Sequence, residues 1–182
     1  MAERQIHGFN YQSYIIDKYN LKAENNYTGK WDAYFHEIPV SIKTKKLGGN
    51  IEMADIFRQC NVESDFILQV GFWENVENNI VEEYTLYIPK IEWNCLFDQD
   101  CLTQYKNLIS TISNNSIDDK KWTNEINRLR VLWKTRTPYL IVPRPKRDHK
   151  TQKRIQCAIN YKPFCNYFIP KYSVVNYFDR NN

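Results

Sequence analysis

The sequence has little of what marks fibrous, disordered, membrane or disulfide-rich proteins. Its 182 residues include five glycines and seven prolines, too few for a collagen-like or low-complexity chain. No apolar run approaches the ~20 residues that a membrane span requires. The first residues lack the apolar stretch of a secretory signal, and five cysteines, an odd number without paired spacing, do not indicate a disulfide framework. We therefore expect a soluble, intracellular globular protein with free thiols and no membrane partner.

Positive charge is concentrated in the last third of the chain. Between residues 130 and 171, eleven Lys or Arg occur with a single acid, Asp148, which gives this segment a net charge of +10. Because the whole chain carries +4, the remainder carries −6. Such a contrast within one chain favours a polyanion-binding face, with nucleic acid as the leading candidate. A solvated basic surface is the ordinary alternative.

The first half of the chain alternates between helical and strand patterns. The expected elements are a helix capped by Asn10, antiparallel strands at 27–35 and 38–44, a helix capped by Asn50, and strands at 66–73 and 80–88. The run 66–73 is apolar almost throughout, which is typical of a strand covered on both faces. We therefore expect this strand near the centre of a sheet.

The second half predicts two longer helices and then a pair of strands. The helices fall at 98–113 and 118–136, and a short strand at 139–142 leads into a proline-stiffened basic loop, 143–150. A strand at 154–161 then returns, and the aromatic tail after it is expected to pack on the body of the protein. Together the patterns predict one α/β domain over residues 1–182, with a mixed β-sheet flanked by helices. Residues 1–92 would form its core, and residues 93–182 its helices and a C-terminal basic β-hairpin.

The first predicted pair of strands brings an aspartate to a lysine. Ser41 and Lys43 lie two apart, so they project from one face, while Val40 and Ile42 point to the core. The turn places Asp32 opposite Ile42 and Lys43. A carboxylate is a hard ligand for Mg²⁺, and an ammonium stabilises charge and positions the metal's water. The arrangement thus suits metal-assisted phosphodiester hydrolysis, although a surface ion pair is the commoner meaning of such a contact.

The same residues carry a resemblance to a known family. Trp31-Asp32-Ala33 and Pro39-Val40-Ser41-Ile42-Lys43-Thr44, after an amphipathic helix and before a Gly-Gly turn and a second helix, resemble the PD-(D/E)XK nuclease superfamily. Over roughly residues 3–88 the order looks most like a type II restriction endonuclease. The resemblance implies a restriction-endonuclease-like core, Mg²⁺-dependent cleavage of double-stranded DNA to 5′-phosphates, and a homodimer on a palindromic site. It implies that Asp32 binds the metal, that Lys43 activates water, and that the Ile42 carbonyl can ligate the metal.

Two positions depart from the family pattern. Ser41 stands where the family usually has Glu or Asp, and Gln12 stands where many relatives have a metal-reaching glutamate. A hydroxyl is a poorer Mg²⁺ ligand than a carboxylate. Some family members with a Ser-X-Lys motif recruit an acid from the following helix, so the resemblance implies Asp55, with Glu52 as the alternative, as the replacement acid. Gln12 can offer a carbonyl oxygen or orient a water. Two alternatives stay open: a catalytically inactive DNA-binding protein on a nuclease scaffold, and a structure-selective DNA resolvase or repair nuclease.

The basic C-terminal segment supplies candidate DNA contacts. Six cations are suited to DNA phosphates: Arg144, Lys146, Arg147, Lys150, Lys153 and Arg154. Gln156 and Asn160 share a polar strand face with Arg154, and such side chains can pair with base edges in the major groove. The alternative is an ordinary solvent-exposed face of an antiparallel strand.

Overall fold

A computed structural model describes residues 3–24, 29–74, 79–113, 119–148 and 152–180. The chain is mixed α/β, and its residues divide into two compact units. The first unit contains residues 1–51, 63–91 and 161–182, and the second contains residues 52–62 and 92–160. Each unit therefore takes segments from both halves of the chain.

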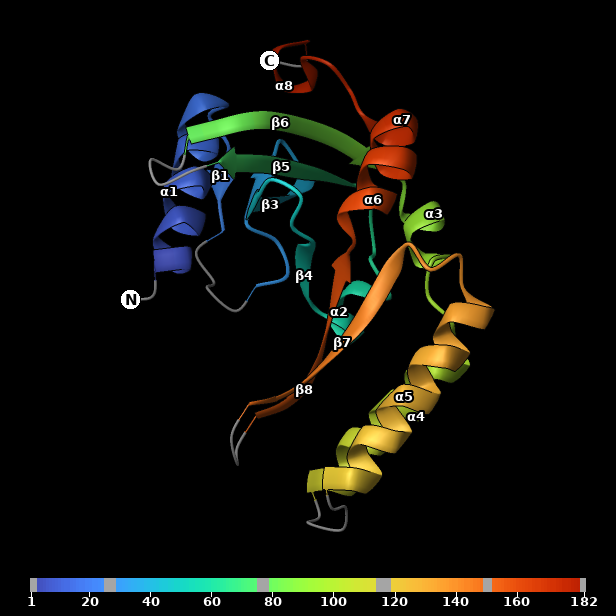
Figure 1. The fold of residues 1–182 in the computed structure, drawn as a ribbon. Coiled ribbons are helices and arrows are strands. Elements are labelled where there is room, and N and C mark those ends of the chain that lie inside the picture. The colour runs from blue at the N-terminus through green and yellow to red at the C-terminus, as the bar shows by residue number, and fades with distance from the viewer. Residues whose placement is uncertain (1–2, 25–28, 75–78, 114–118, 149–151, 181–182) are drawn as a thin grey trace. The chain divides into compact units, whose positions relative to one another are not determined.

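The first unit is built on a five-stranded mixed sheet flanked by helices. Its early elements are α1 (Glu3–Lys18), β1 (Lys22–Ala23), β2 (Ala33–Phe35), β3 (Ile38–Lys46), β5 (Phe66–Glu74) and β6 (Asn79–Ile88). Its late elements are α6 (Tyr161–Pro163), the π-helical turn η1 (Phe164–Phe168), α7 (Ile169–Tyr172) and α8 (Tyr177–Arg180). The strand order is β1-β2-β3-β5-β6; β3 and β5 are parallel and the other neighbours antiparallel (Figure 1).

The strand β5 is buried from Phe66 to Phe72, which confirms the expectation of a strand covered on both faces. On one face, Tyr11 and Ile15 of α1 belong to a buried apolar cluster with Val40 of β3. On the other face, the ring centroid of Phe164 lies 5.6 Å from that of Phe72. The two covers come from the two ends of the chain.

The aromatic tail packs back on the first unit, as the sequence predicts. Phe164, Phe168 and Phe178 are buried. The Val174 N–H donates to the Thr85 carbonyl at 2.9 Å, so the tail also binds the outer edge of β6.

The second unit contains a three-stranded sheet and a pair of long helices. Its elements are β4 (Ile51–Asp55), α2 (Ile56–Gln59), α4 (Gln99–Ser113), α5 (Asp119–Arg136), β7 (Ile141–Asp148) and β8 (Gln152–Ile159), and α3 (Lys90–Asn94) leads into it from the first unit. The strand order is β4-β8-β7, and α4 and α5 lie side by side (Figure 1). Both long helices were expected. Arg136 of α5 binds Asp98 and Asp100 at 3.1 and 2.7 Å, which ties α5 to the start of α4.

Three expectations about local structure are wrong. Residues 51–55 form the strand β4 and not a helix capped by Asn50, because Ile51 and Met53 are buried at a period of two and the chain turns at Ala54, whose φ is 66°. Asn10 lies inside α1 and does not cap it. Residues 143–148 belong to β7 and not to a loop, because β7 is an edge strand, where a sheet tolerates proline.

The contact of α1 with the sheet depends on the absence of a side chain at Gly71. A Cβ atom at this position would lie 2.5 Å from Cζ of Tyr11. The Tyr11 hydroxyl donates to Glu83 Oε2 at 3.2 Å and accepts from Gln69 Nε2 at 3.2 Å. Tyr11 is thus held in place, and moving its ring aside would break these hydrogen bonds.

We therefore expect Gly71→Ala to lower the free energy of unfolding by ~2 kcal/mol, the usual scale for overpacking a core. Gly8→Ala is the matched control, because Gly8 lies within α1 and a Cβ there meets nothing within 4 Å. That control should be neutral or stabilising by up to ~1 kcal/mol. Urea denaturation followed by circular dichroism measures both, and equal effects would contradict the packing argument.

Candidate active site

The register of β2 and β3 brings Asp32, Ser41 and Lys43 together. Ala33 pairs with Val40, and the Asp32 N–H extends the pairing by donating to the Val40 carbonyl at 2.9 Å. The Asp32 carboxylate then faces the next residues of β3. Its Oδ2 accepts from the Ile42 N–H at 2.7 Å, from Lys43 Nζ at 2.7 Å and from the Ser41 hydroxyl at 3.4 Å.

The Asp32–Lys43 ion pair is better shielded than an ordinary surface pair. The two side chains are 25% and 22% exposed, and Ser41 beside them is 1% exposed. A backbone N–H holds the carboxylate as well, so the pair depends on more than two flexible side chains. Partial burial and a fixed partner both favour a defined geometry over the loose contact of a surface pair.

This group of residues offers Mg²⁺ a single protein carboxylate, that of Asp32. All the hydrogen bonds that the described residues make to the Asp32 carboxylate go to Oδ2, so Oδ1 is available as a hard oxygen ligand. Within the described ranges, no group of three or more His, Cys, Asp or Glu side chains is placed to hold a metal. Mg²⁺ is commonly bound by one or two carboxylates, with water and substrate phosphate completing its shell. A metal bound at Asp32 would therefore depend on phosphate.

Gln12 is not joined to this group by a hydrogen bond. It lies on α1, the helix that packs through Tyr11 against the β3 face bearing Val40 and Ile42. Ser41 alternates with these residues and so projects from the other face of β3. Among the described residues, Gln12 makes no hydrogen bond to Asp32, Ser41 or Lys43, and its catalytic role stays a prediction.

The two candidate replacement acids lie in the second unit and have partners there. Asp55 is the N-cap of α2, and its Oδ1 accepts from the N–H groups of Phe57 and Arg58 at 2.9 and 3.3 Å. Glu52 binds Arg144 through Oε1 at 3.1 Å. Each acid thus has a structural contact that the sequence did not indicate, and the role of Asp55 as a metal ligand stays a prediction.

The capping contact can be tested by itself. Asp55→Ala should lower the free energy of unfolding by ~1 kcal/mol, because two backbone donors lose their acceptor. Asp55→Asn should change it by no more than ~0.5 kcal/mol, since asparagine is an equally good cap. Thermal denaturation distinguishes the two variants, and a similar loss in both would contradict the capping role. Loss of DNA cleavage in a stable Asp55→Asn variant would instead support the predicted metal ligand.

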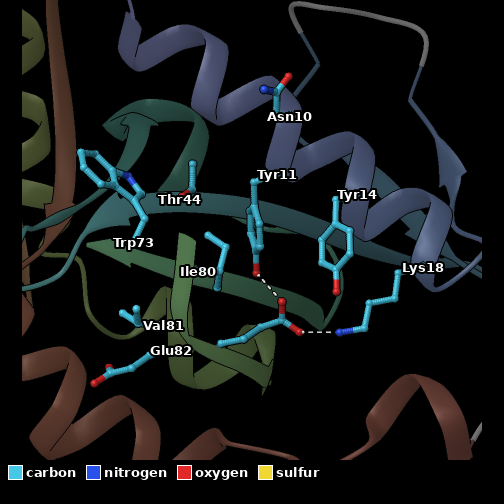
Figure 2. Close-up of a pocket in the computed structure, with 10 residues that line it drawn as sticks. Asn10, Tyr11, Tyr14, Lys18, Thr44, Trp73, Ile80, Val81 and Glu82 are labelled. Carbon is cyan, nitrogen blue, oxygen red and sulfur yellow. Dashed lines mark hydrogen bonds and ion pairs between the residues drawn. The ribbon is translucent and has the colours of Figure 1, made fainter. Parts of the chain in front are cut away.

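A separate cavity of about 640 Å³ lies between α1 and the sheet of the first unit (Figure 2). Tyr11, Tyr14 and Lys18 enter it from α1, and Thr44 enters it from β3. Thr44 follows Lys43 in an extended strand, so the cavity opens on the face of β3 opposite to Lys43. Tyr11, Tyr14 and Lys18 follow one another at i, i+3 and i+7, which places them on one face of the helix. This shared face was not predicted from the sequence, although the spacing indicates it.

Glu83 organises the wall of this cavity. Its carboxylate accepts from Tyr11, Lys18 and Tyr19 at 3.2, 3.0 and 3.3 Å. Burial, and then the charge of Glu83, raise the pKa of Tyr11 well above the ordinary tyrosine value. Tyr11 therefore stays protonated and donates to Glu83 throughout the physiological range.

The predicted DNA contacts fall largely on the antiparallel strands β7 and β8. Arg144 is opposite Gln156, Lys146 is opposite Arg154, and the backbone register places Arg147 opposite Lys153. The alternate residues are buried: Ile141, Pro143, Ile155, Cys157 and Ile159. Asn160 follows the end of β8, and Lys150 lies outside the described residues. Arg144, Lys146, Arg154 and Gln156 thus share the face of the two strands opposite to these buried residues.

Comparison of the chain with protein-family models, with curated proteins and with solved structures finds no match. The function must therefore be argued from the residues and their geometry. In the part of the chain that the structure describes, no helix is both long enough and apolar enough to cross a membrane.

Proposed function

We propose that this protein is an intracellular Mg²⁺-dependent endonuclease of the type II restriction class, which cuts double-stranded DNA at specific sites and leaves 5′-phosphates. The observation that carries the proposal is the 2.7 Å contact in the first unit between Lys43 Nζ on β3 and Oδ2 of Asp32, the residue before β2. It is supported by the resemblance of the motif around these residues to the PD-(D/E)XK nucleases. A homodimer would match a palindromic site.

In the proposed reaction, a water oxygen attacks the phosphorus atom, the bond from phosphorus to O3′ breaks, and a 5′-phosphate and a 3′-hydroxyl result. Asp32 would hold the metal through Oδ1, with the Ile42 carbonyl as a further candidate ligand. When bound, Mg²⁺ neutralises the phosphate charge and lowers the pKa of its water. Lys43 donates hydrogen bonds that orient the attacking water and stabilise the charge that develops on the phosphate. Asp32 Oδ2 keeps Lys43 in position, and the Ser41 hydroxyl donates to the same Asp32 oxygen.

Lys43→Ala should reduce the rate of Mg²⁺-dependent plasmid cleavage by about a thousandfold, the scale for loss of a group that stabilises the transition state. Lys46→Ala is the matched control, because Lys46 is an exposed lysine on the same strand and projects from the opposite face. The control should cut DNA at the wild-type rate into the same discrete fragments.

Absence of cleavage by the wild-type protein with Mg²⁺ or Mn²⁺ on diverse DNA would contradict the proposal. Cleavage by Lys43→Ala at the wild-type rate would contradict the assigned role of Lys43. Cutting of branched DNA without regard to sequence would indicate the resolvase or repair nuclease alternative.

The second candidate is a DNA-binding protein without hydrolytic activity. It is favoured by one specific observation: Asp32 is the only carboxylate among the described residues that contacts Lys43, while position 41 is a buried neutral serine. This candidate predicts salt-sensitive DNA binding that is the same with Mg²⁺ and with EDTA, and no cleavage of any substrate.

A further inference from the structure

Glu52 lies against the cationic surface of the second unit. We define the polar ribbon face as Arg144 and Lys146 of β7 with Arg154 and Gln156 of β8. Glu52 lies on β4, and its Oε1 accepts from Arg144 Nη1 at 3.1 Å. Because β8 lies between β4 and β7, this ion pair crosses over β8.

The register of β7 and β8 sets cationic residues opposite one another. Lys146 is opposite Arg154, and both share the polar ribbon face with Arg144. Directly opposed residues have Cβ atoms ~5 Å apart, and like charges at this distance destabilise the pairing. Such a pair is unfavourable in an isolated sheet and becomes favourable beside a polyanion.

The ion pair between Glu52 and Arg144 is incompletely formed. Only Oε1 of Glu52 accepts from Arg144, while Oε2 is buried and has no hydrogen-bond partner among the described residues. A guanidinium group has five donors and can bind two oxygens of a phosphate at once. The two side chains are 33% and 35% exposed, so an incoming anion can reach Arg144.

We propose that the polar ribbon face binds double-helical DNA in the major groove, and that Glu52 competes with a DNA phosphate for Arg144. Two strands lie 4.7–4.9 Å apart, and the major groove, ~12 Å wide, admits a two-stranded ribbon. The opposite ribbon face is buried, so the polar ribbon face is the one that the duplex can contact. This inference rests on the proposed function in taking DNA as the partner, and it does not require cleavage.

The test is the binding of a fluorescein-labelled duplex by fluorescence anisotropy, in EDTA and at salt concentrations from 50 to 200 mM. Glu52→Gln should bind about three- to fivefold more tightly than the wild type, the range for removing a partly exposed ion pair. The slope of log K against log salt should become more negative by ~0.9, which corresponds to one additional phosphate contact. Glu63→Gln is the matched control, because it removes the same charge from an exposed residue of the first unit. Its salt slope should equal that of the wild type.

A double variant isolates Arg144. In an Arg144→Ala background, Glu52→Gln should give no gain in affinity and no change in slope. A full gain in that background, or an equal gain in Glu63→Gln, would overturn the competition between Glu52 and phosphate. Circular dichroism confirms that each variant is folded.

The choice of groove is tested in the same assay. A duplex with glucosylated 5-hydroxymethylcytosine, whose sugar fills the major groove, should bind at least tenfold more weakly, whereas netropsin in the minor groove should leave binding unchanged. The reverse result would overturn the major-groove assignment. No binding to any duplex would overturn both this inference and the proposed function, whereas binding with the predicted Glu52 effect but no cleavage in Mg²⁺ would leave only the hydrolytic activity refuted.

Discussion

The burial of β5 on both faces is the constraint that the first unit is built to satisfy. A strand of this kind needs a cover on each side, and α1 and the C-terminal aromatic segment provide them. Gln69 is fully buried within β5, and it is tolerated because Tyr11 and Thr85 take up its amide at 3.2 and 2.6 Å. Tyr11 of α1 therefore both covers β5 and binds the buried Gln69 amide, which fixes where α1 lies on the sheet.

This constraint also places the candidate active site. β3 pairs with β5 in parallel, with Ser41 opposite Leu68 and Lys43 opposite Val70. Lys43 is thus carried by an internal strand and not by a loop, and its ammonium group binds Asp32, the residue before the neighbouring strand β2. Sites on such rigid elements keep their geometry better than sites on loops. The site is weak as a metal site because it has only one carboxylate among the described residues, and not because its residues are badly positioned.

The sequence was a good guide where the signal was local. The continuous apolar run of β5 and the helical periodicity of α4 and α5 each reflect burial of residues close together in the chain. The contact of Asp32 with Lys43 could also be predicted from the sequence, because a short turn sets the register of β2 and β3. Predictions of secondary structure were wrong for short segments that can form either a helix or a strand. The segment 51–55 has apolar residues that suit a helix as well as a strand, and pairing with a distant β8 decides the outcome.

Glu52 shows why the remaining part could not be predicted. In the linear charge pattern it belongs to the acidic part of the chain, and its place on the predicted helix after Lys43 made it a candidate to supply charge to a metal site. In the folded second unit it contacts Arg144, 92 residues away, within the most basic region of the protein. Counting charges along the chain locates a basic segment, but pairing across a sheet determines how much of that charge is available to a ligand. The acids that the fold brings to this segment therefore reduce its attraction for DNA below what its net charge suggests. Glu52, on the strand β4 beside the proposed DNA-binding strands, is such an acid.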